Sequence, residues 1–201
     1  NWEQMEYDDF LSLRRRLIAN VAKEGFDALK RTGVDFEVLT PIERIQQGES
    51  ETQEFKKSAR WSFNTENKRK SEQIIIKTIA GFLNRNGGSL FIGVNDDCSV
   101  VGLELDFATL SKGNPDGYEL FLSQLIDNSI SGPSNTFCKI VFHEIEGHKV
   151  CEVKVSPSNQ PVFCSSLSNP RQHIDFWIRE GNRTIQYYGE KQHAYITSNW
   201  E

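Results

Sequence analysis

The sequence lacks the features that mark membrane, secreted and zinc-binding proteins. No apolar run approaches the length of about 20 residues that crosses a bilayer, and the first residues do not predict a signal peptide. Four widely spaced cysteines form no Cys-x-x-Cys pair: Cys98, Cys138, Cys151 and Cys164. We therefore expect a cytoplasmic protein with reduced thiols, no membrane partner and no structural zinc.

The 201 residues carry 23 lysines and arginines against 28 acids, for a formal net charge of -5. This length and a hydrophobic content of 37% suit one globular domain with a helical extension. We expect the extension over residues 1–40 and the domain over residues 41–201. Because the chain opens with Asn1 rather than Met, we also expect it to be part of a larger chain.

The basic residues are concentrated in one block. Residues 56–85 hold eight lysines or arginines and only two acids, Glu66 and Glu72. Acidic residues flank this block on both sides: Glu49, Glu51 and Glu54 before it, Asp96 and Asp97 after it. A basic block attracts a phosphate backbone because binding releases condensed counterions. Carboxylates beside it are ligands for a hard divalent cation, so the pattern predicts phosphodiester chemistry on a nucleic acid.

Hydrophobic periodicity predicts an α+β fold, with a mostly antiparallel sheet of hairpins packed with helices. The expected helices cover residues 7–32, 41–47, 71–85, 118–130 and 189–200. The expected strands cover residues 51–59, 89–94, 100–103 and 161–164, with hairpins over 137–156 and 174–188. Residues 60–70 are expected to form a loop.

The acidic residues have two interpretations each. Glu54 and Lys56 share a strand face by the two-residue period, which is typical of a metal-dependent nuclease but more often of an exposed ion pair. Glu49 has the opposite parity and joins them only if the chain bends after Gly48. Asp96 lies in an Asn-Asp-Asp turn and is either ordinary turn chemistry or a third carboxylate of the same pocket.

Seven basic residues are candidates for contacting a nucleic-acid backbone without reading its sequence. They are Lys57, Arg60, Lys68, Arg69, Lys70, Arg179 and Arg183. Arg179 and Arg183 stand at the ends of a hairpin tip, where phosphate contact and a solvated tip are the two alternatives.

Several strings together resemble the Schlafen AlbA-like domain over about residues 42–200. They are Gly48-Glu-Ser-x-x-x-Glu-Phe-Lys56, Gly87-Gly-Ser-Leu-Phe-Ile-Gly-Val94 and Phe176-Trp-Ile-Arg-Glu-Gly-Asn-Arg-Thr184. The resemblance implies a nucleic-acid-binding fold. Some animal members cut transfer or ribosomal RNA with a metal held by three carboxylates, which fall here on Glu49, Glu54 and Asp96, with Lys56 as the adjacent lysine. Cys98 departs from the pattern, since bacterial relatives usually have glycine there.

The resemblance therefore implies a metal-dependent endoribonuclease that acts on structured RNA such as tRNA with Mg²⁺ or Mn²⁺. A role in antiphage defence follows by analogy alone. Animal members grip RNA between two lobes, so this single lobe would need a homodimer to form the same groove. The alternative is a non-catalytic DNA- or RNA-binding module of a larger regulator or defence protein. A third is an oligomerisation or nucleotide-sensing module without a polynucleotide partner.

Overall fold

The computed structural model describes residues 16–17, 20–21, 39–61, 68–166 and 169–200. The chain divides into two compact units, residues 1–39 and 40–201. In the first unit the described residues 16–17 and 20–21 are helical, and the rest of the helix expected over residues 7–32 lies outside the described residues. In the described parts of the chain, no helix is long and apolar enough to cross a membrane.

The second unit opens with a short capped helix, α2 (Pro41–Gln46). The Thr40 hydroxyl accepts a hydrogen bond from the Glu43 amide, and the Glu43 carboxylate accepts one from the Thr40 amide at 2.7 Å. This reciprocal capping box satisfies amides that have no partner inside the helix. Gly48 follows with a φ of 81°, a conformation that favours glycine. The helix predicted here is confirmed.

A four-stranded sheet with the order β1-β2-β4-β3 carries the acidic motifs. Its strands are β1 (Gln53–Lys56), β2 (Gly88–Ile92), β3 (Cys138–Ile145) and β4 (His148–Val155). The predicted β3–β4 hairpin is confirmed, and β2 also pairs antiparallel with β4. β1 differs because it runs parallel to β2, with Lys56 opposite Ile92. The carboxyl ends of β1 and β2 therefore lie at the same edge of the sheet.

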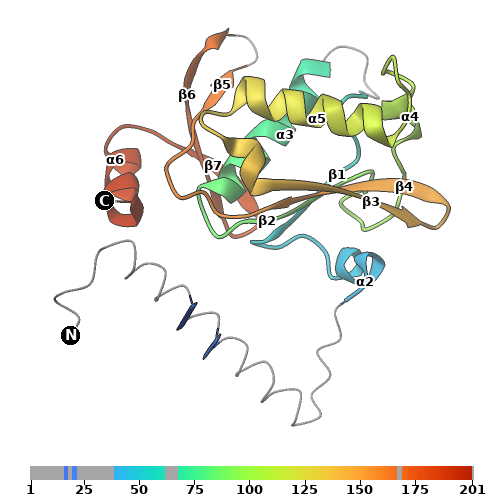
Figure 1. Cartoon of the computed structure of the whole chain (residues 1–201), viewed down its shortest axis with the longest axis horizontal. Helices are drawn as coiled ribbons and strands as arrows, with labels where there is room; N and C mark the ends of the chain where they lie inside the picture. The colour runs from blue at the N-terminus through green and yellow to red at the C-terminus, as the bar shows by residue number, and fades with distance from the viewer. Residues whose placement is uncertain (1–15, 18–19, 22–38, 62–67, 167–168, 201) are drawn as a thin grey trace. The chain divides into compact units, whose positions relative to one another are not determined.

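Two long helices, α3 (Lys68–Leu83) and α5 (Pro115–Ser129), cover one face of this sheet. Figure 1 shows α5 running along that face, with α2 on the opposite side. Leu90 and Ile92 of β2 point to the two helices and are fully buried with Ile76, Ile79 and Leu122. Burial of each such side chain stabilises the fold by roughly 1.5–3 kcal/mol.

The opposite face of the sheet has a smaller core beneath α2. Phe55 and Phe91 alternate with the residues of the first core and meet edge to face, with ring centroids 6.0 Å apart. Ile45 of α2 packs on them and is fully buried. Both faces of β1 are therefore covered in part, although it is an edge strand.

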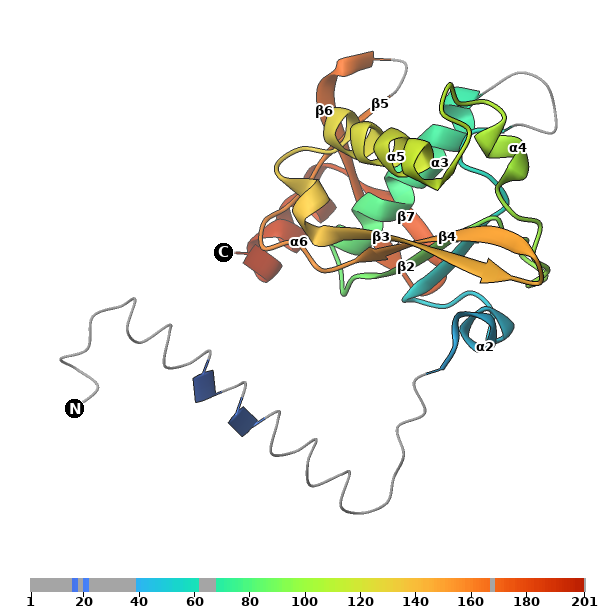
Figure 2. The ribbon, with the colours of Figure 1, turned by 45° about the vertical axis from the view of Figure 1, so that its right-hand side comes forward.

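A second, three-stranded sheet has the order β5-β6-β7. Its elements are β5 (Cys164–Ser166), β6 (Asn169–Glu180) and β7 (Arg183–Tyr187), followed by α6 (Gly189–Trp200). Tyr195 and Trp200 of α6 pack their rings on Phe176 of β6. Figure 2 shows α6 next to this sheet at the C-terminal end of the chain. The amide side chain of Asn84, after α3, donates to Trp177 of β6 at 3.0 Å and so ties the long helix to the second sheet.

Some local predictions are wrong. α3 begins at Lys68 rather than Ser71, because lysine and arginine are good helix formers and extend the first turn. The strand expected over residues 100–103 is reduced to a single bridge between Val94 and Val100. A short helix, α4 (Glu104–Phe107), takes the chain away from the sheet, and β5 begins at Cys164, where the predicted strand ends. A 3-10 turn, η2 (Ser134–Phe137), precedes β3.

Candidate acidic site and nucleic-acid interface

Glu49 and Glu54 reach the same place by different routes. Glu54 projects from β1, whereas Glu49 lies in the turn before that strand. The bend that the sequence requires at Gly48 is present, and Ser50 forms a bridge with Gln53 that tightens the turn. As a result the Glu49 carboxylate folds back and accepts a hydrogen bond from the Phe55 amide at 2.9 Å.

Lys56 lies between the two carboxylates. Its Nζ is 2.6 Å from Oε1 of Glu54 and 3.7 Å from Oε1 of Glu49. The sum of these two distances is the upper limit of the separation between the two carboxylate oxygens. The Glu54 side chain is only 11% exposed, and those of Lys56 and Glu49 are 24% exposed. The cluster is therefore partly withdrawn from water, where charge pairs interact more strongly than on an open surface.

Arg179 of β6 approaches Glu54 from the other side. Its Nη1 lies 2.6 Å from Oε2 of Glu54, although this buried oxygen accepts no aligned hydrogen bond from the described residues. The guanidinium also donates to the carbonyls of Ser50, Glu51 and Gln53 at 2.6, 3.3 and 3.2 Å. Glu54 is thus held between two cations.

The predicted phosphate contact of Arg179 is wrong. The residue is 1% exposed, and its donors face the turn before β1 instead of solvent. It stacks over the Phe82 ring at 5.2 Å, within the second sheet's contact with α3. Arg183, four residues later, is exposed at the β6–β7 hairpin and keeps the predicted position.

Asp96 does not join the acidic pair in this structure. It is exposed in the turn between Val94 and Val100, and the neighbouring Asp97 accepts hydrogen bonds from Ser99. These hydrogen bonds lower the pKa of Asp97. Within the described residues, no group of three or more histidines, cysteines, aspartates and glutamates could hold a metal ion. The turn nonetheless starts beside the acidic site, because the Lys56 carbonyl accepts hydrogen bonds from residues 93 and 94 at 2.8 and 3.3 Å.

The remaining basic candidates are placed as follows. Lys57 and Lys70 are exposed, and the Arg60 guanidinium lies 4.9 Å from the centre of the Phe121 ring. Lys68 and Arg69 belong to the first turn of α3, and their side chains lie outside the described residues. Exposed cations thus lie directly after β1 (Lys57), in the first turn of α3 (Lys70) and at the β6–β7 hairpin (Arg183).

Comparison with known proteins supports the resemblance seen in the sequence. The family model described as Schlafen, AlbA_2 matches residues 49–187, which is more than half of the chain. The chain belongs to the Schlafen AlbA_2 family. The match includes Glu49, Glu54, Lys56 and Asp96, and family membership supports a function related to nucleic acids.

A solved structure that matches the chain in part is the DIP2311 protein from Corynebacterium diphtheriae. It shares 19% sequence identity with this Schlafen domain, at a TM-score of 0.46 over 87% of this chain and 30% of that chain. The domain therefore spans less than a third of the length of that relative. A comparison with curated proteins finds no match.

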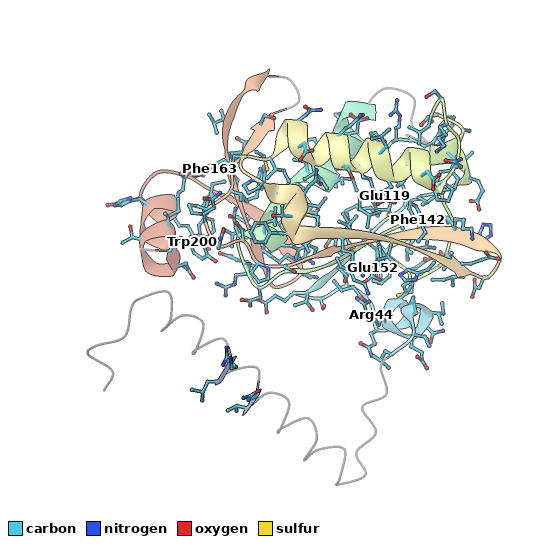
Figure 3. The ribbon with its side chains drawn as sticks, viewed as in Figure 1. Arg44, Glu119, Phe142, Glu152, Phe163 and Trp200 are labelled. Carbon is cyan, nitrogen blue, oxygen red and sulfur yellow. The ribbon has the colours of Figure 1, made fainter. Side chains whose placement is uncertain are left out.

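The sequence reasoning missed a second charged cluster in this Schlafen domain, around Glu152 of β4. Glu152 is fully buried, with Arg44 of α2 at 2.6 Å, the Ser89 hydroxyl at 2.7 Å and the His143 ring at 2.8 Å. Lys154 lies 3.6 Å away. Figure 3 shows Arg44 rising from α2 toward Glu152 in the sheet. Burial would raise the pKa of Glu152, but hydrogen bonds from Ser89, Arg44 and His143 outweigh burial and lower it.

A signal for this cluster was present in the sequence. In β4, Glu152 points to the face of the sheet opposite to the one that carries Cys151 and Val153. The alternation along the strand therefore predicts that another element covers Glu152 on that face. A carboxylate at such a position needs a cationic partner. The partner on α2 could not be read from the sequence, because it depends on which face of the sheet the helix covers.

Proposed function

We propose that this Schlafen domain binds structured RNA and hydrolyses its phosphodiester backbone with Mg²⁺ or Mn²⁺. The observation that carries the proposal is the meeting of Glu49 and Glu54 around one cation, the Lys56 ammonium, beside exposed basic residues. Oxygen donors of this kind suit a hard cation, and Mg²⁺ is commonly bound by only one or two carboxylates together with water and substrate phosphate.

Each residue has a role in this proposal. Glu49 and Glu54 would hold the metal ion. Asp96, which is separate from them in this structure, would add a third carboxylate only if the turn after β2 moved toward the pair. The ion supplies polarisation of the phosphoryl oxygen and an activated water. Lys56 offsets the negative charge that develops at phosphorus, while Arg179 keeps Glu54 oriented through its ion pair. Lys57, Arg60, Lys70 and Arg183 bind the backbone, with Lys68 and Arg69 from the same helix turn as Lys70.

A cleavage assay tests the catalytic part. Labelled tRNA, rRNA and DNA are incubated with the protein in Mn²⁺ or in EDTA, and Glu54→Gln is compared with the unaltered chain. We expect RNA products only with metal and a loss of about 100-fold or more in Glu54→Gln, with RNA binding retained. Glu51→Gln is the matched control, because Glu51 lies in the same turn but is exposed and 3.7 Å from Arg85.

A second function, a non-catalytic nucleic-acid-binding module, is favoured by one observation. Both oxygens of Glu54 already face cations, Lys56 and Arg179, so the carboxylate is neutralised without a metal. In that case the unaltered chain binds RNA or DNA but yields no metal-dependent product, and this outcome contradicts the nuclease proposal. Whether the active form is a homodimer is tested by measuring its mass in solution with and without RNA.

A further inference from the structure

A pocket of about 400 Å³ opens between the segment after β1 and the first turns of α5. Leu110, Leu120 and Phe121 form an apolar wall. The polar residues that line the pocket include Arg60, Ser111 and Gln124. The volume falls within the range of small-molecule sites, which are typically apolar with a few polar groups that fix orientation. The acidic site does not use this pocket.

Arg60 has an unused donor at the pocket. Its guanidinium lies over the Phe121 ring at 4.9 Å, and its Nε is buried without an acceptor among the described residues. Buried polar groups in native proteins are nearly always hydrogen-bonded, and a ligand oxygen is one acceptor that would satisfy this donor. The planar fork of arginine matches a phosphate group well.

The fold fixes Arg60 at this place through Asp106 of α4. Asp106 is 1% exposed and accepts hydrogen bonds from the amides of Ala59 at 2.9 Å and Trp61 at 2.8 Å, which flank Arg60. The Tyr118 hydroxyl of α5 donates to the same carboxylate at 2.7 Å. Burial and the Asp106 charge raise the pKa of Tyr118 well above its ordinary value, so the hydroxyl keeps its proton and donates. The backbone of Arg60 is thus held before any ligand arrives.

A glycine shapes the other side of the pocket. A Cβ at Gly117 would lie 2.0 Å from the Lys112 carbonyl oxygen, so only glycine lets the preceding loop rest on the first turn of α5. The Gly117 amide is capped by the Asn114 side chain at 3.0 Å, and the Lys112 ammonium pairs with Asp116 at 3.0 Å. The helix end and this lysine are therefore already engaged. Among the described residues that line the pocket, Arg60 is the cation whose buried donor has no acceptor.

We propose that the pocket binds one nucleotide unit of the bound strand, with its phosphate on Arg60 and its base against the apolar wall. This rests on the proposed nucleic-acid binding and adds a positioning step to it. Arg60 follows Lys56 by four residues, so a nucleotide anchored here would fix the strand near the acidic pair. A pocket for a single unit favours strands with unpaired nucleotides, because a base in a duplex must first leave its stack.

Calorimetric titration with AMP, CMP, GMP and UMP tests the pocket, with inorganic phosphate as the comparison ligand. We expect the mononucleotides to bind more tightly than phosphate, and Arg60→Met and Leu120→Ser each to weaken them by about tenfold. Leu120 is 59% exposed, so its substitution leaves the fold intact. Lys139→Met removes an exposed cation from β3, away from the pocket, and should leave mononucleotide binding unchanged.

Three outcomes separate this inference from the proposed function. If polynucleotides bind but mononucleotides do not, or bind no better than phosphate, the pocket assignment is overturned and the proposed function stands. Equal binding by the Arg60→Met and Leu120→Ser variants overturns it as well. If mononucleotides bind at the pocket and no polynucleotide binds, the assignment to a strand fails together with the proposed function.

Discussion

The side chain of Arg179 connects the acidic site to the second sheet. It is 1% exposed, it pairs with Glu54, and it holds three carbonyl groups of the turn that carries Glu49 and Glu54. Removing one partner of a buried charge pair leaves the other charge without compensation, which costs more than the pair contributes. The position of both carboxylates therefore depends on this residue.

Replacing Arg179 with methionine should lower the free energy of unfolding by about 3–5 kcal/mol. The reason is that Glu54 loses its buried ion-pair partner, and the carbonyls of Ser50, Glu51 and Gln53 lose their donor. Urea denaturation measures the change. Arg183→Met, at the exposed end of the same hairpin, is the control and should change stability by less than about 0.5 kcal/mol. If Arg179→Met and Arg183→Met have the same free energy of unfolding, the buried guanidinium of Arg179 contributes no more to stability than the exposed guanidinium of Arg183.

For single residues, the sequence predicts which side chains share a strand face, but it does not predict which other residues pack against that face. The two-residue period correctly puts Glu54 and Lys56 together, because parity depends only on local backbone geometry. The burial of Arg179 could not be predicted in this way, since its acceptors lie 126 to 129 residues earlier in the chain. Asp96 shows the same limit, because a turn motif does not reveal where its carboxylate points.

At the scale of elements, a buried carboxylate adds a charged contact to the packing of α2 on the sheet. Glu152 of β4 binds Arg44 of α2, and His143 and Lys154 approach it from the same sheet. The pKa of Glu152 is lowered in the folded protein relative to its ordinary value of 4.5. Folding therefore favours the charged carboxylate, and this contribution is present above about pH 4.5 and is lost as the pH falls through the lower folded value.

Glu152→Gln should remove that part of the acid dependence. At neutral pH we expect a loss of about 1.5–3 kcal/mol in the free energy of unfolding, since charged hydrogen bonds to Arg44 and His143 are weakened. As the pH falls below 4.5 and through the lowered folded pKa of Glu152, the difference from the unaltered chain should shrink, because its own carboxylate becomes protonated. Unfolding curves between pH 3 and pH 7 provide the measurement. A constant difference across this range would contradict the assigned direction of the pKa.

The parallel pairing of β1 and β2 could have been predicted from the order of elements. A strand, a long helix and a second strand over residues 53–92 form the connection that parallel strands require. Hydrophobic alternation gave the two strands and their faces, but alternation is the same for either direction of pairing. The β3–β4 hairpin was predictable in full, because its turn at Glu146-Gly147 joins two strands with matching alternation.

At the scale of the whole molecule, an acidic chain must bind a polyanion through a local basic surface. The net charge is -5, so in the proposed function the approach of a nucleic acid would depend on the exposed cations near β1 and α3 instead of on the overall field. Binding carried by phosphate contacts weakens steeply with salt, because each contact releases a counterion.

Lys70→Ala should lower the slope of log K against log salt concentration by about 1, and Arg183→Ala should do the same. Both side chains are exposed in the structure. Fluorescence anisotropy with labelled RNA between about 50 and 200 mM salt measures the slope. Lys139→Ala, an exposed cation of β3, serves as the control with an unchanged slope. A slope that is the same in all the variants would place the RNA on another surface.

The long sequence separation between Arg179 and the turn it binds also matters while the chain is being synthesised. The turn with Glu49 leaves the ribosome before the guanidinium that holds it, which follows 129 residues behind Ser50. Until β6 is made, the nascent polypeptide has the two carboxylates without the Arg179 guanidinium. The carbonyl groups of Ser50, Glu51 and Gln53 therefore gain this donor only after the rest of the four-stranded sheet has been synthesised.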